Sequence, residues 1–335
     1  MRGREDDVTA VVGMLDERVV TIVDNAVMGE TPSRSDLVFL LRFDAYSPEA
    51  AYVCARAREV GMRACNRKGY VYAQIGVDSS PCPRNCRFCP FAEANVADNA
   101  MADSMRELPI GRIVHFAKVL EDAGIDLISL MATAGLSFKR YLDMVRAVHA
   151  SLSGRATIMA NTGDLSMDQA RELKEAGVGA AYHAIRLGEG ELTDIKPLDR
   201  RRTIRHLRAM GIPIMTAVEP LWEGADPVAI SEIINDIPEF DPFCIDAFGL
   251  ETADGSRIGG LKPALAGSVR YVAAITRLVC WESAPIGGIG GVAWVNVGCG
   301  LIDQGVPDDD AALRARVRAA KRSLARDGFK VSNLG

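Results

Sequence analysis

Three cysteines stand close together in the stretch PCPRNCRFCPF, at Cys82, Cys86 and Cys89. Their spacing is C-x3-C-x2-C, and no fourth cysteine follows nearby. Thiolates bind zinc and iron–sulfur clusters, so this triplet predicts a metal centre. A structural zinc site uses four ligands, and the nearest histidine, His115, lies far along the next predicted helix. Ferredoxin-type clusters also use a fourth cysteine, so zinc and simple electron transfer are both disfavoured.

The missing fourth cysteine has a chemical meaning of its own. Three thiolates can hold three of the four irons in a [4Fe–4S] cluster. The fourth iron then keeps an open coordination position, as catalytic metals do, and can bind a ligand that takes part in the reaction. The triplet therefore predicts a catalytic iron–sulfur cluster.

A repeated strand–helix pattern, which begins near residue 70, must position this triplet. Short, continuous apolar runs alternate with helical patterns, as is typical of parallel strands buried on both faces. The runs are residues 71–77, 126–132, 156–161, 179–185, 212–218 and 243–249. This alternation predicts a (β/α) barrel or an open doubly wound sheet. No G-x-G-x-x-G follows the first run, which disfavours a dinucleotide-binding sheet.

Helix boundaries between these runs are well marked. Pro109 suits a first helical turn, Ser166 and Gln169 form a capping-box pattern, and Asp226 precedes a proline as an N-cap residue would. Helices are expected to end in a left-handed glycine before the next strand. These glycines are Gly124, Gly177 and Gly211.

The ends of the chain complete the expected organisation. Residues 1–69 read as a mostly helical N-terminal extension, and residues 70–305 as the barrel. A helix is expected over about 264–282, and residues 284–298 could hold two further strands. Residues 306–335 read as a C-terminal helix, about 308–326, with a tail packed on the barrel. Whether the barrel closes does not follow from the pattern.

Composition excludes several classes of protein. The net charge is −5 and the sequence has no long Lys/Arg run, so a nucleic-acid partner is not expected. The sequence contains no stretch of 18 uncharged apolar residues, so no membrane span is predicted. The acidic start is unlike a signal peptide. We therefore expect a cytoplasmic protein whose scattered cysteines are buried thiols. Cys299 could alternatively be a redox thiol.

The cysteine spacing, with the aromatic Phe88 before the last cysteine and an apolar strand before the loop, resembles the radical S-adenosylmethionine (SAM) superfamily. The segment NRKGYVYAQIGVDSSPCPRNCRFCPFA resembles biotin synthase, methylornithine synthase and the related [FeFe]-hydrogenase maturase. MANTGDLSMDQARELKEAGVGAAYH is similar to the same group. VEPLWEGADPVAISEII is most similar to the methylornithine synthase branch and to methanogen enzymes that methylate the hydrogenase pyridinol cofactor.

The resemblance implies a full or nearly full TIM-like (β/α) barrel, a [4Fe–4S] cluster and SAM as cofactors. It also implies a one-electron reductant such as flavodoxin or ferredoxin, and cleavage of SAM to a 5′-deoxyadenosyl radical. Some features depart from the group. MATAG replaces the usual Gly-Gly-Glu, and the ligands of the second biotin synthase cluster are not matched by cysteines. The methanogen enzymes have a longer gap between their first two cysteines.

Residues at the expected strand ends are assigned to the cofactor by this resemblance. Thr133 is expected near the methionine moiety, and an arginine after the fourth strand can pair with the SAM carboxylate. A surface Arg–Glu pair is the alternative for that arginine, and a turn or cap is the alternative for Asn161. The remaining expected cofactor contacts are Phe88, Asn161, Thr162, Arg186 and Glu189.

Three further residues are expected to hold the substrate. Glu219 ends the fifth strand, and its carboxylate could bind a substrate amine. Asp246 is a charge inside an apolar strand and needs a partner, either substrate or arginine. His183 lies mid-strand on one face with Ala181 and Ile185, where a core histidine is an equal alternative.

The resulting hypothesis is a radical SAM enzyme that removes a hydrogen atom from a small polar, amino-acid-like substrate. Rearrangement or cleavage of the carbon skeleton would follow. One alternative is methyl or one-carbon transfer in cofactor biosynthesis. A second alternative is an iron–sulfur scaffold protein that is not an enzyme.

Overall fold

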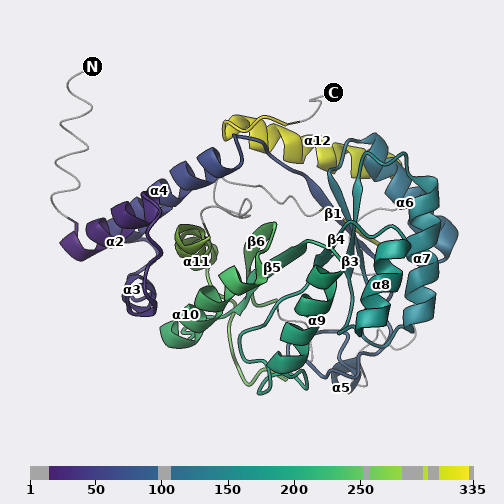
Figure 1. Ribbon diagram of the computed structural model, residues 1–335, viewed down its shortest axis with the longest axis horizontal. Helices are drawn as coiled ribbons and strands as arrows, with labels where there is room; N and C mark the ends of the chain where they lie inside the picture. The colour runs from purple at the N-terminus through teal and green to yellow at the C-terminus, as the bar shows by residue number, and fades with distance from the viewer. Residues whose placement is uncertain (1–14, 97–106, 252–256, 281–296, 301–308, 332–335) are drawn as a thin grey trace.

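A curled parallel sheet forms the centre of the computed structural model (Figure 1). The structure describes residues 15–96, 107–251, 257–280, 297–300 and 309–331. The sheet has seven strands in the order β6-β5-β4-β3-β2-β1-β7, and each neighbouring pair is parallel. The strands are β1 (Tyr72–Gly76), β2 (Leu127–Met131), β3 (Thr157–Asn161), β4 (Ala180–Tyr182), β5 (Ile214–Leu221), β6 (Cys244–Gly249) and β7 (Val297–Gly300).

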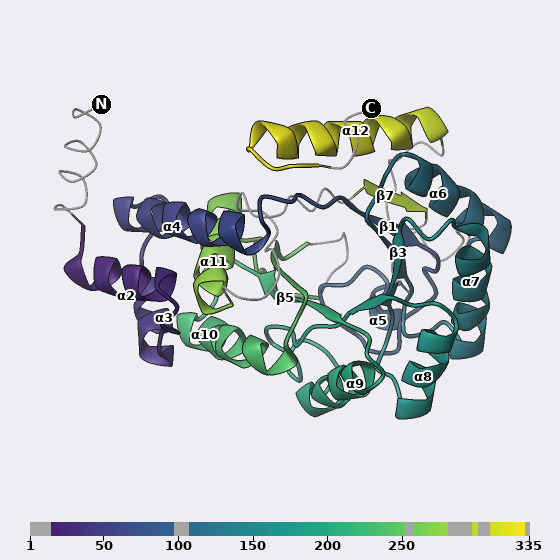
Figure 2. The ribbon, with the colours of Figure 1, turned by 45° about the horizontal axis from the view of Figure 1, so that its top comes forward.

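Helices alternate with the strands, and the helices from α6 to α11 cover the outer, convex face of the sheet, while α2 and α3 pack on other helices (Figures 1 and 2). The helices of the described residues are α2 (Glu17–Val27), α3 (Arg34–Leu40), α4 (Pro48–Ala64), α5 (Glu93–Val96), α6 (Ile110–Asp122), α7 (Phe138–Ser151), α8 (Met167–Glu175), α9 (Pro197–Ala209), α10 (Pro227–Asp236), the 3-10 helix η2 (Ile237–Phe240), α11 (Ala266–Val279) and α12 (Asp310–Arg326). The alternation of strand and helix makes the fold a (β/α) partial barrel, as the apolar runs predict. In the described sheet, β6 and β7 are the two end strands.

The two faces of the sheet carry different residues. One face packs against the helices in two apolar clusters. The other face lines the interior of the partial barrel, which we call the lumen. Its apolar part consists of Tyr72, Leu127, Met159, Ala180, Tyr182, Ala184, Met215, Ala217 and Cys244. Because side chains alternate along a strand, the residues between these belong to the outer face.

Most of the expected boundaries are confirmed. All six predicted strands are present, and Ser166 and Gln169 form the capping box that begins α8. Asp226 caps α10, and the three expected glycines have φ angles of +80°, +103° and +65°. The predicted fifth strand, over 212–218, ends too early, since β5 continues through a cis Glu219–Pro220 bond to Leu221.

The terminal segments pack on the barrel as helices. The Tyr271 hydroxyl on α11 donates to the Leu40 carbonyl (2.7 Å), joining the N-terminal helices to the barrel. The C-terminal helix α12 lies beside α6 and β7 (Figure 2), where Lys321 Nζ donates to the Ala123 carbonyl (3.1 Å). Of the region predicted to hold two more strands, residues 284–296 lie outside the described residues, and β7 follows directly. No helix in the described part of the chain is long and apolar enough to cross a membrane.

Candidate functional site

The carboxyl ends of the strands meet on one side of the sheet, where (β/α) barrels build their active sites. The loop after β1, residues 77–92, carries the cysteine triplet to this side. The segments after β2, β3 and β4 and the end of β5 bring further polar residues to the same side. The topology therefore gathers the predicted cysteines and strand-end residues at one rim.

Backbone contacts fold the cysteine loop back on itself. The Cys82 N–H donates to the Phe91 carbonyl (2.6 Å), and the Glu93 N–H donates to the Cys82 carbonyl (3.0 Å). The Cys89 N–H donates to the Cys86 carbonyl (3.0 Å), which closes a tight turn between these two ligand candidates. The loop is thus held in shape by its own backbone before any cluster binds.

Asn95 holds the same loop from inside. Its side chain is only 1% exposed, and its Nδ2 donates to the carbonyls of Cys89 (2.9 Å) and Arg87 (3.2 Å). Its Oδ1 accepts from Arg257 Nε (2.8 Å). A second attachment comes from the segment after β4, since the Arg87 N–H donates to the Leu192 carbonyl (2.9 Å).

The three thiols lie near enough to one another to interact electrostatically. Burial raises the pKa of Cys86 to about 12, the nearby Arg186 guanidinium opposes this shift, and Cys89 and Cys82 add to it. Burial likewise raises the pKa of Cys89. Within the described residues, no three His, Cys, Asp or Glu side chains converge tightly enough to hold one metal ion. A [4Fe–4S] cluster spreads its thiolates over different irons, so this triplet fits a cluster better than a single ion.

Thr133, at the end of β2, is tied to a buried acid. Asp78 is fully buried after β1 and accepts from the Thr133 hydroxyl (2.7 Å) and the Thr133 N–H (3.1 Å). The hydroxyl in turn accepts from the Gly135 N–H (3.1 Å). A Cβ on Gly135 would lie 2.4 Å from the Pro81 carbonyl, so only glycine fits here, directly beside the start of the cysteine loop. Thr133 therefore fixes the loop through Asp78.

An ion pair spans the mouth of the lumen. Arg186 Nε donates to Glu219 Oε1 (2.8 Å), and the Leu187 N–H donates to the Glu219 carbonyl (2.6 Å). Burial disfavours the charged guanidinium, but Glu219, Tyr182, Cys86 and Glu189 together raise the pKa of Arg186. Arg186 thus lies between the cysteine loop and the lumen and pairs with Glu219, instead of forming the alternative Arg–Glu surface pair.

Asp246 lies deeper in the lumen. It is 4% exposed, and its Oδ1 accepts the Ala247 N–H (2.8 Å). Burial, with a contribution from Glu219, raises the pKa of Asp246 to about 7 in spite of that hydrogen bond. No lysine or arginine in the described ranges pairs with it.

Neutral polar groups complete the lumen. Asn161 Nδ2 donates to Gln74 Oε1 (3.2 Å), which also accepts from the Tyr72 hydroxyl (2.8 Å). The buried Tyr182 hydroxyl lies near Glu219, and the buried Ser129 hydroxyl near Tyr72, yet neither makes a hydrogen bond of normal geometry to another described residue. Buried hydroxyls without partners are uncommon and suggest groups that await a ligand.

His183 is outside the lumen. The sequence predicts it beside Glu219 and Asp246, but it follows Tyr182 and shares the outer face with Ala181. Burial, with Arg200 nearby, lowers the pKa of His183 to about 4, so the ring is neutral. Alternation alone left two alternatives for His183, a substrate contact and a core histidine. The structure shows that His183 is a core histidine.

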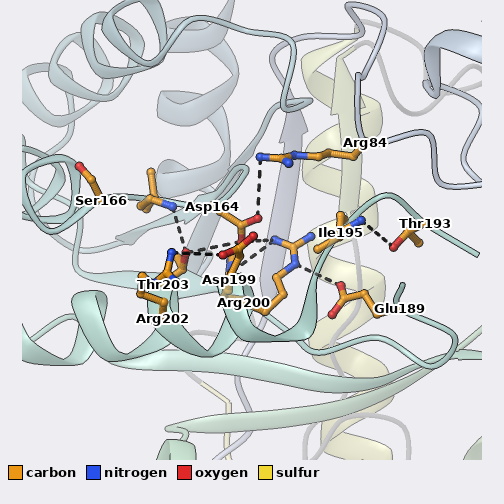
Figure 3. A network of polar contacts seen from close by, with 12 residues as sticks. Arg84, Asp164, Ser166, Glu189, Thr193, Ile195, Asp199, Arg200, Arg202 and Thr203 are labelled. Carbon is orange, nitrogen blue, oxygen red and sulfur yellow. Dashed lines mark hydrogen bonds and ion pairs between the residues drawn. The ribbon is translucent and has the colours of Figure 1, made fainter. Parts of the chain in front are cut away.

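His183 belongs to a buried ionic network with Asp164 and Arg200, and Figure 3 shows Asp164 and Arg200 with Arg84 and Glu189. Although burial opposes ionisation, His183, Arg200 and Arg84 hold the pKa of Asp164 at about 2. The ionised Asp164 can only accept, so His183 Nε2 donates to it (3.1 Å) and Arg200 also donates (3.2 Å). Arg200 Nε donates to Glu189 as well (3.2 Å). The network joins the cysteine loop, through Arg84, to the segments after β3 and β4.

The predicted site residues therefore divide into groups. Glu219 and Asp246 line the lumen with Asn161, and Arg186 reaches from it toward the cysteines. Glu189 is 1% exposed and engaged by Arg200, with one carboxylate oxygen that has no partner within the described ranges. The half-buried Phe88 and Thr162 lie on the rim segments and remain predicted cofactor contacts.

Several site residues were missed by reasoning from sequence. Asp78, directly after the first apolar run, and Asn95 could have been suspected as polar residues flanking the triplet. The lumen residues Gln74, Ser129 and Tyr182 carry a weaker signal, a single polar group inside an apolar strand. Their shared face becomes evident only from the strand register.

Comparisons with known proteins agree with this geometry. Residues 79–236 match the model of the radical SAM superfamily. The chain is 25% identical over 196 residues to a biotin synthase of Picosynechococcus sp., covering 53% of this chain and 52% of that protein. It is 31% identical over 153 residues to a biotin synthase of Sorangium cellulosum, covering 42% and 41%. The chain thus spans about half the length of the curated relatives it matches.

Solved structures with the same fold are also found. The crystal structure of methylornithine synthase has a TM-score of 0.75 at 17% identity and covers 93% of this chain and 98% of that one. The FeFe-hydrogenase maturase HydG from Carboxydothermus hydrogenoformans has a TM-score of 0.73 at 15% identity, covering 94% and 79%. At these identities the likeness concerns the fold, the (β/α) partial barrel.

Proposed function

Because this chain contains a radical SAM domain at residues 79–236, we propose that it is an enzyme that uses a [4Fe–4S] cluster and SAM to remove a hydrogen atom from a small polar substrate. When bound, these cofactors supply the radical chemistry, because an electron from the cluster cleaves SAM to methionine and a 5′-deoxyadenosyl radical. The substrate then rearranges or breaks its carbon skeleton. Methyl or one-carbon transfer is the alternative outcome.

One observation carries the proposal. The loop with Cys82, Cys86 and Cys89 stands at the carboxyl ends of the strands, directly above a lumen lined by polar groups. Three thiols and no fourth leave a coordination position for a ligand on the metal, and the polar lumen residues Asn161, Glu219 and Asp246 are the candidates for holding a second molecule.

The protein's own residues would bind, orient and shield. The cysteines would hold the cluster, with Asn95 and the backbone of the loop fixing their positions. Arg186 stands between the loop and the lumen and is suited to an anionic group of the cofactor, such as a carboxylate. The buried lumen around Glu219 and Asp246 would hold the substrate away from water, which protects a reactive radical from side reactions.

The biotin synthase relatives do not define the reaction of this chain. Outside the triplet, Cys54 lies on α4, Cys65 directly after it, Cys244 on β6, Cys280 at the end of α11 and Cys299 on β7. No second group of thiols that could hold another cluster is present in the described part of the chain. Sulfur insertion is therefore not part of the proposal.

Anaerobic reconstitution tests the proposal. The purified chain is loaded with iron and sulfide, reduced with dithionite or a flavodoxin system, and given SAM. We expect about four irons per chain and formation of 5′-deoxyadenosine. Alanine at any cysteine of the triplet should abolish both, whereas Cys65→Ala, directly after α4, should retain both.

The outcomes separate the rival functions. A chain that binds a cluster but forms no deoxyadenosine under these conditions is an iron–sulfur scaffold, and the proposal is then wrong. Substrate candidates are next supplied with SAM labelled in its methyl group. Label in the product would establish methyl transfer, and its absence with deoxyadenosine formation would support rearrangement or cleavage.

A further inference from the structure

We propose that Asp246 binds a positively charged nitrogen of the substrate, an ammonium or amidinium group, inside the lumen. The inference rests on the proposed function and narrows its substrate to amines and amidines. The observation behind it is a carboxylate that is buried among the lumen residues and has no cationic partner within the described residues.

No cationic side chain within the described residues pairs with Asp246. Its side chain shares the lumen face with Cys244 and Phe248, while Ile245 and Ala247 pack on the outer face. The Ala247 N–H is its hydrogen-bond donor, and no other donor to it lies within the described ranges. A buried carboxylate is ordinarily paired with a cation or with several donors, so this one is left unsatisfied.

The residues outside the described ranges offer few lysines or arginines that could pair with Asp246. The segments around β6 and β7 that lie outside the described residues are 252–256, 281–296 and 301–308, and they contain no lysine or arginine. The basic residues outside the described ranges are Arg2, Arg4 and Arg106. A cation supplied by a ligand is therefore the simpler way to satisfy Asp246.

The charges of the lumen point the same way. Glu219 is already paired with Arg186, so Asp246 is the carboxyl that remains. A ligand with one positive charge would make the set of Arg186, Glu219 and Asp246 neutral overall. An ammonium group also has three donors, and the unpartnered Tyr182 and Ser129 hydroxyls in the same lumen can accept.

Depth separates this position from the cluster side. In the register of β5 and β6, Ala217 lies opposite Asp246, so Asp246 stands two residues below the level of Glu219. Two residues of a strand correspond to about 7 Å. The cysteine loop is attached to the rim near Arg186, so a molecule held by Asp246 would lie beneath a cofactor bound at the rim.

The tyrosines and the arginine near Asp246 have pKa values outside the range of pH 6 to pH 8. Burial raises the pKa of Tyr72 and of Tyr182 above the ordinary value for tyrosine. From the helix layer, Arg277 of α11 interacts with Cys244, and burial lowers the pKa of Arg277 to about 10. Glu219 forms an ion pair with Arg186. Of these four groups, Asp246, Tyr72, Tyr182 and Arg277, Asp246 is the one expected to change charge between pH 6 and pH 8.

A binding experiment on the reconstituted enzyme tests the inference. Calorimetry is done anaerobically with saturating SAM and without reductant, so that no chemistry occurs. The probes are n-pentylamine and 1,5-diaminopentane, with n-pentanol as the neutral counterpart. We expect the amines to bind more tightly than the alcohol, with affinity about tenfold higher at pH 8 than at pH 6 and proton release near pH 7. Asp246→Asn should weaken amine binding at least tenfold at pH 8, whereas the exposed Asp241→Asn should not.

Each contrary result overturns the inference. Absence of amine binding at 10 mM, or equal binding of amine and alcohol, would mean that the lumen does not select a cation. Tighter binding at pH 6 would mean that a protonated Asp246 donates to a neutral acceptor. If Asp246→Asn weakened SAM binding instead, Asp246 would belong to the cofactor site. The binding test needs no SAM cleavage, so the two proposals can fail separately. A chain that forms deoxyadenosine but does not bind amines would refute only this inference. A chain that binds amines but does not cleave SAM would refute only the proposed function.

Discussion

Replacing Asp246 by asparagine should stabilise the ligand-free protein, and should do so increasingly as the pH rises. The folded pKa of Asp246 is about 7, raised by burial, while an aspartate in an unfolded chain has a pKa near 3.9. Folding is therefore favoured by the protonated acid. This contribution is fully present below about pH 4 and is lost as the pH rises to 7.

The magnitude follows from the difference between the two pKa values. About three pKa units correspond to roughly 4 kcal/mol of stability lost at pH 8. At pH 5 the unfolded carboxyl is already ionised, so about 1.5 kcal/mol is lost there. Asparagine has the shape of the protonated acid, and its Oδ1 can accept the Ala247 N–H as Asp246 does. The stability of Asp246→Asn relative to the natural chain should therefore increase by about 2.5 kcal/mol between pH 5 and pH 8.

Equilibrium urea unfolding of the cluster-free chain at pH 5, 6, 7 and 8 measures this difference. Other groups titrate equally in both proteins and cancel in the comparison. Asp241→Asn is the matched control, because Asp241 is exposed and pairs only with the surface Arg208 among the described residues. A difference between Asp246→Asn and the natural chain that stays constant within about 1 kcal/mol over this pH range would show that Asp246 ionises normally, and the reasoning about its burial would be wrong.

Three further predictions concern the support of the cysteine loop. Gly135→Ala should displace Pro81, the residue before the first cysteine, and should at least halve the bound iron, as measured by iron analysis. Gly111→Ala is the control, because its new Cβ would have no atom within 4 Å, and it should leave the bound iron unchanged. Asn95→Leu removes three side-chain hydrogen bonds, so bound iron should again fall by half or more while far-ultraviolet circular dichroism stays unchanged; full iron occupancy would contradict this. Arg200→Met removes the arginine that pairs with two buried carboxylates, Asp164 and Glu189, and should cost about 3 kcal/mol or more in urea unfolding, against about 0–1 kcal/mol for the exposed Arg202→Met.

The sequence predicted the framework of this fold well, because each local signal had one physical cause. Parallel strands covered on both faces read as continuous apolar runs, and all six runs became strands. The capping box at Ser166 and the glycine at 177 fixed the limits of α8 for similarly local reasons. The end of β5 was misjudged, since a proline at position 220 reads as a strand end, although the strand runs past it.

Partners across the fold could not be read in the same way. Alternation grouped His183 with Ala181, and this is correct, but both faces of a buried strand are apolar. Nothing in the sequence says which face meets the lumen, so His183 was assigned to the substrate when it belongs to the network of Asp164 and Arg200. The hydrogen bonds of Thr133 to Asp78 could not be read from the sequence either, because Asp78 lies on a different strand end, and the contact of Thr133 with the cofactor stays a prediction.

The segment after β4 links the two halves of the proposed site. Its first part supplies Arg186, which pairs with Glu219 at the mouth of the lumen. Its last part holds the cysteine loop, since the Asp194 N–H donates to the Arg84 carbonyl (2.9 Å) and Asp194 accepts from Asn85 Nδ2 (3.1 Å). Arg186 and Asp194 lie on the same short segment. This one stretch of backbone therefore positions both the loop that would carry the cluster and the entrance that would admit the substrate. The buried pair of Arg200 with Glu189 anchors that stretch at its centre, which is why a residue remote from both ligands should affect cluster binding and lumen binding together.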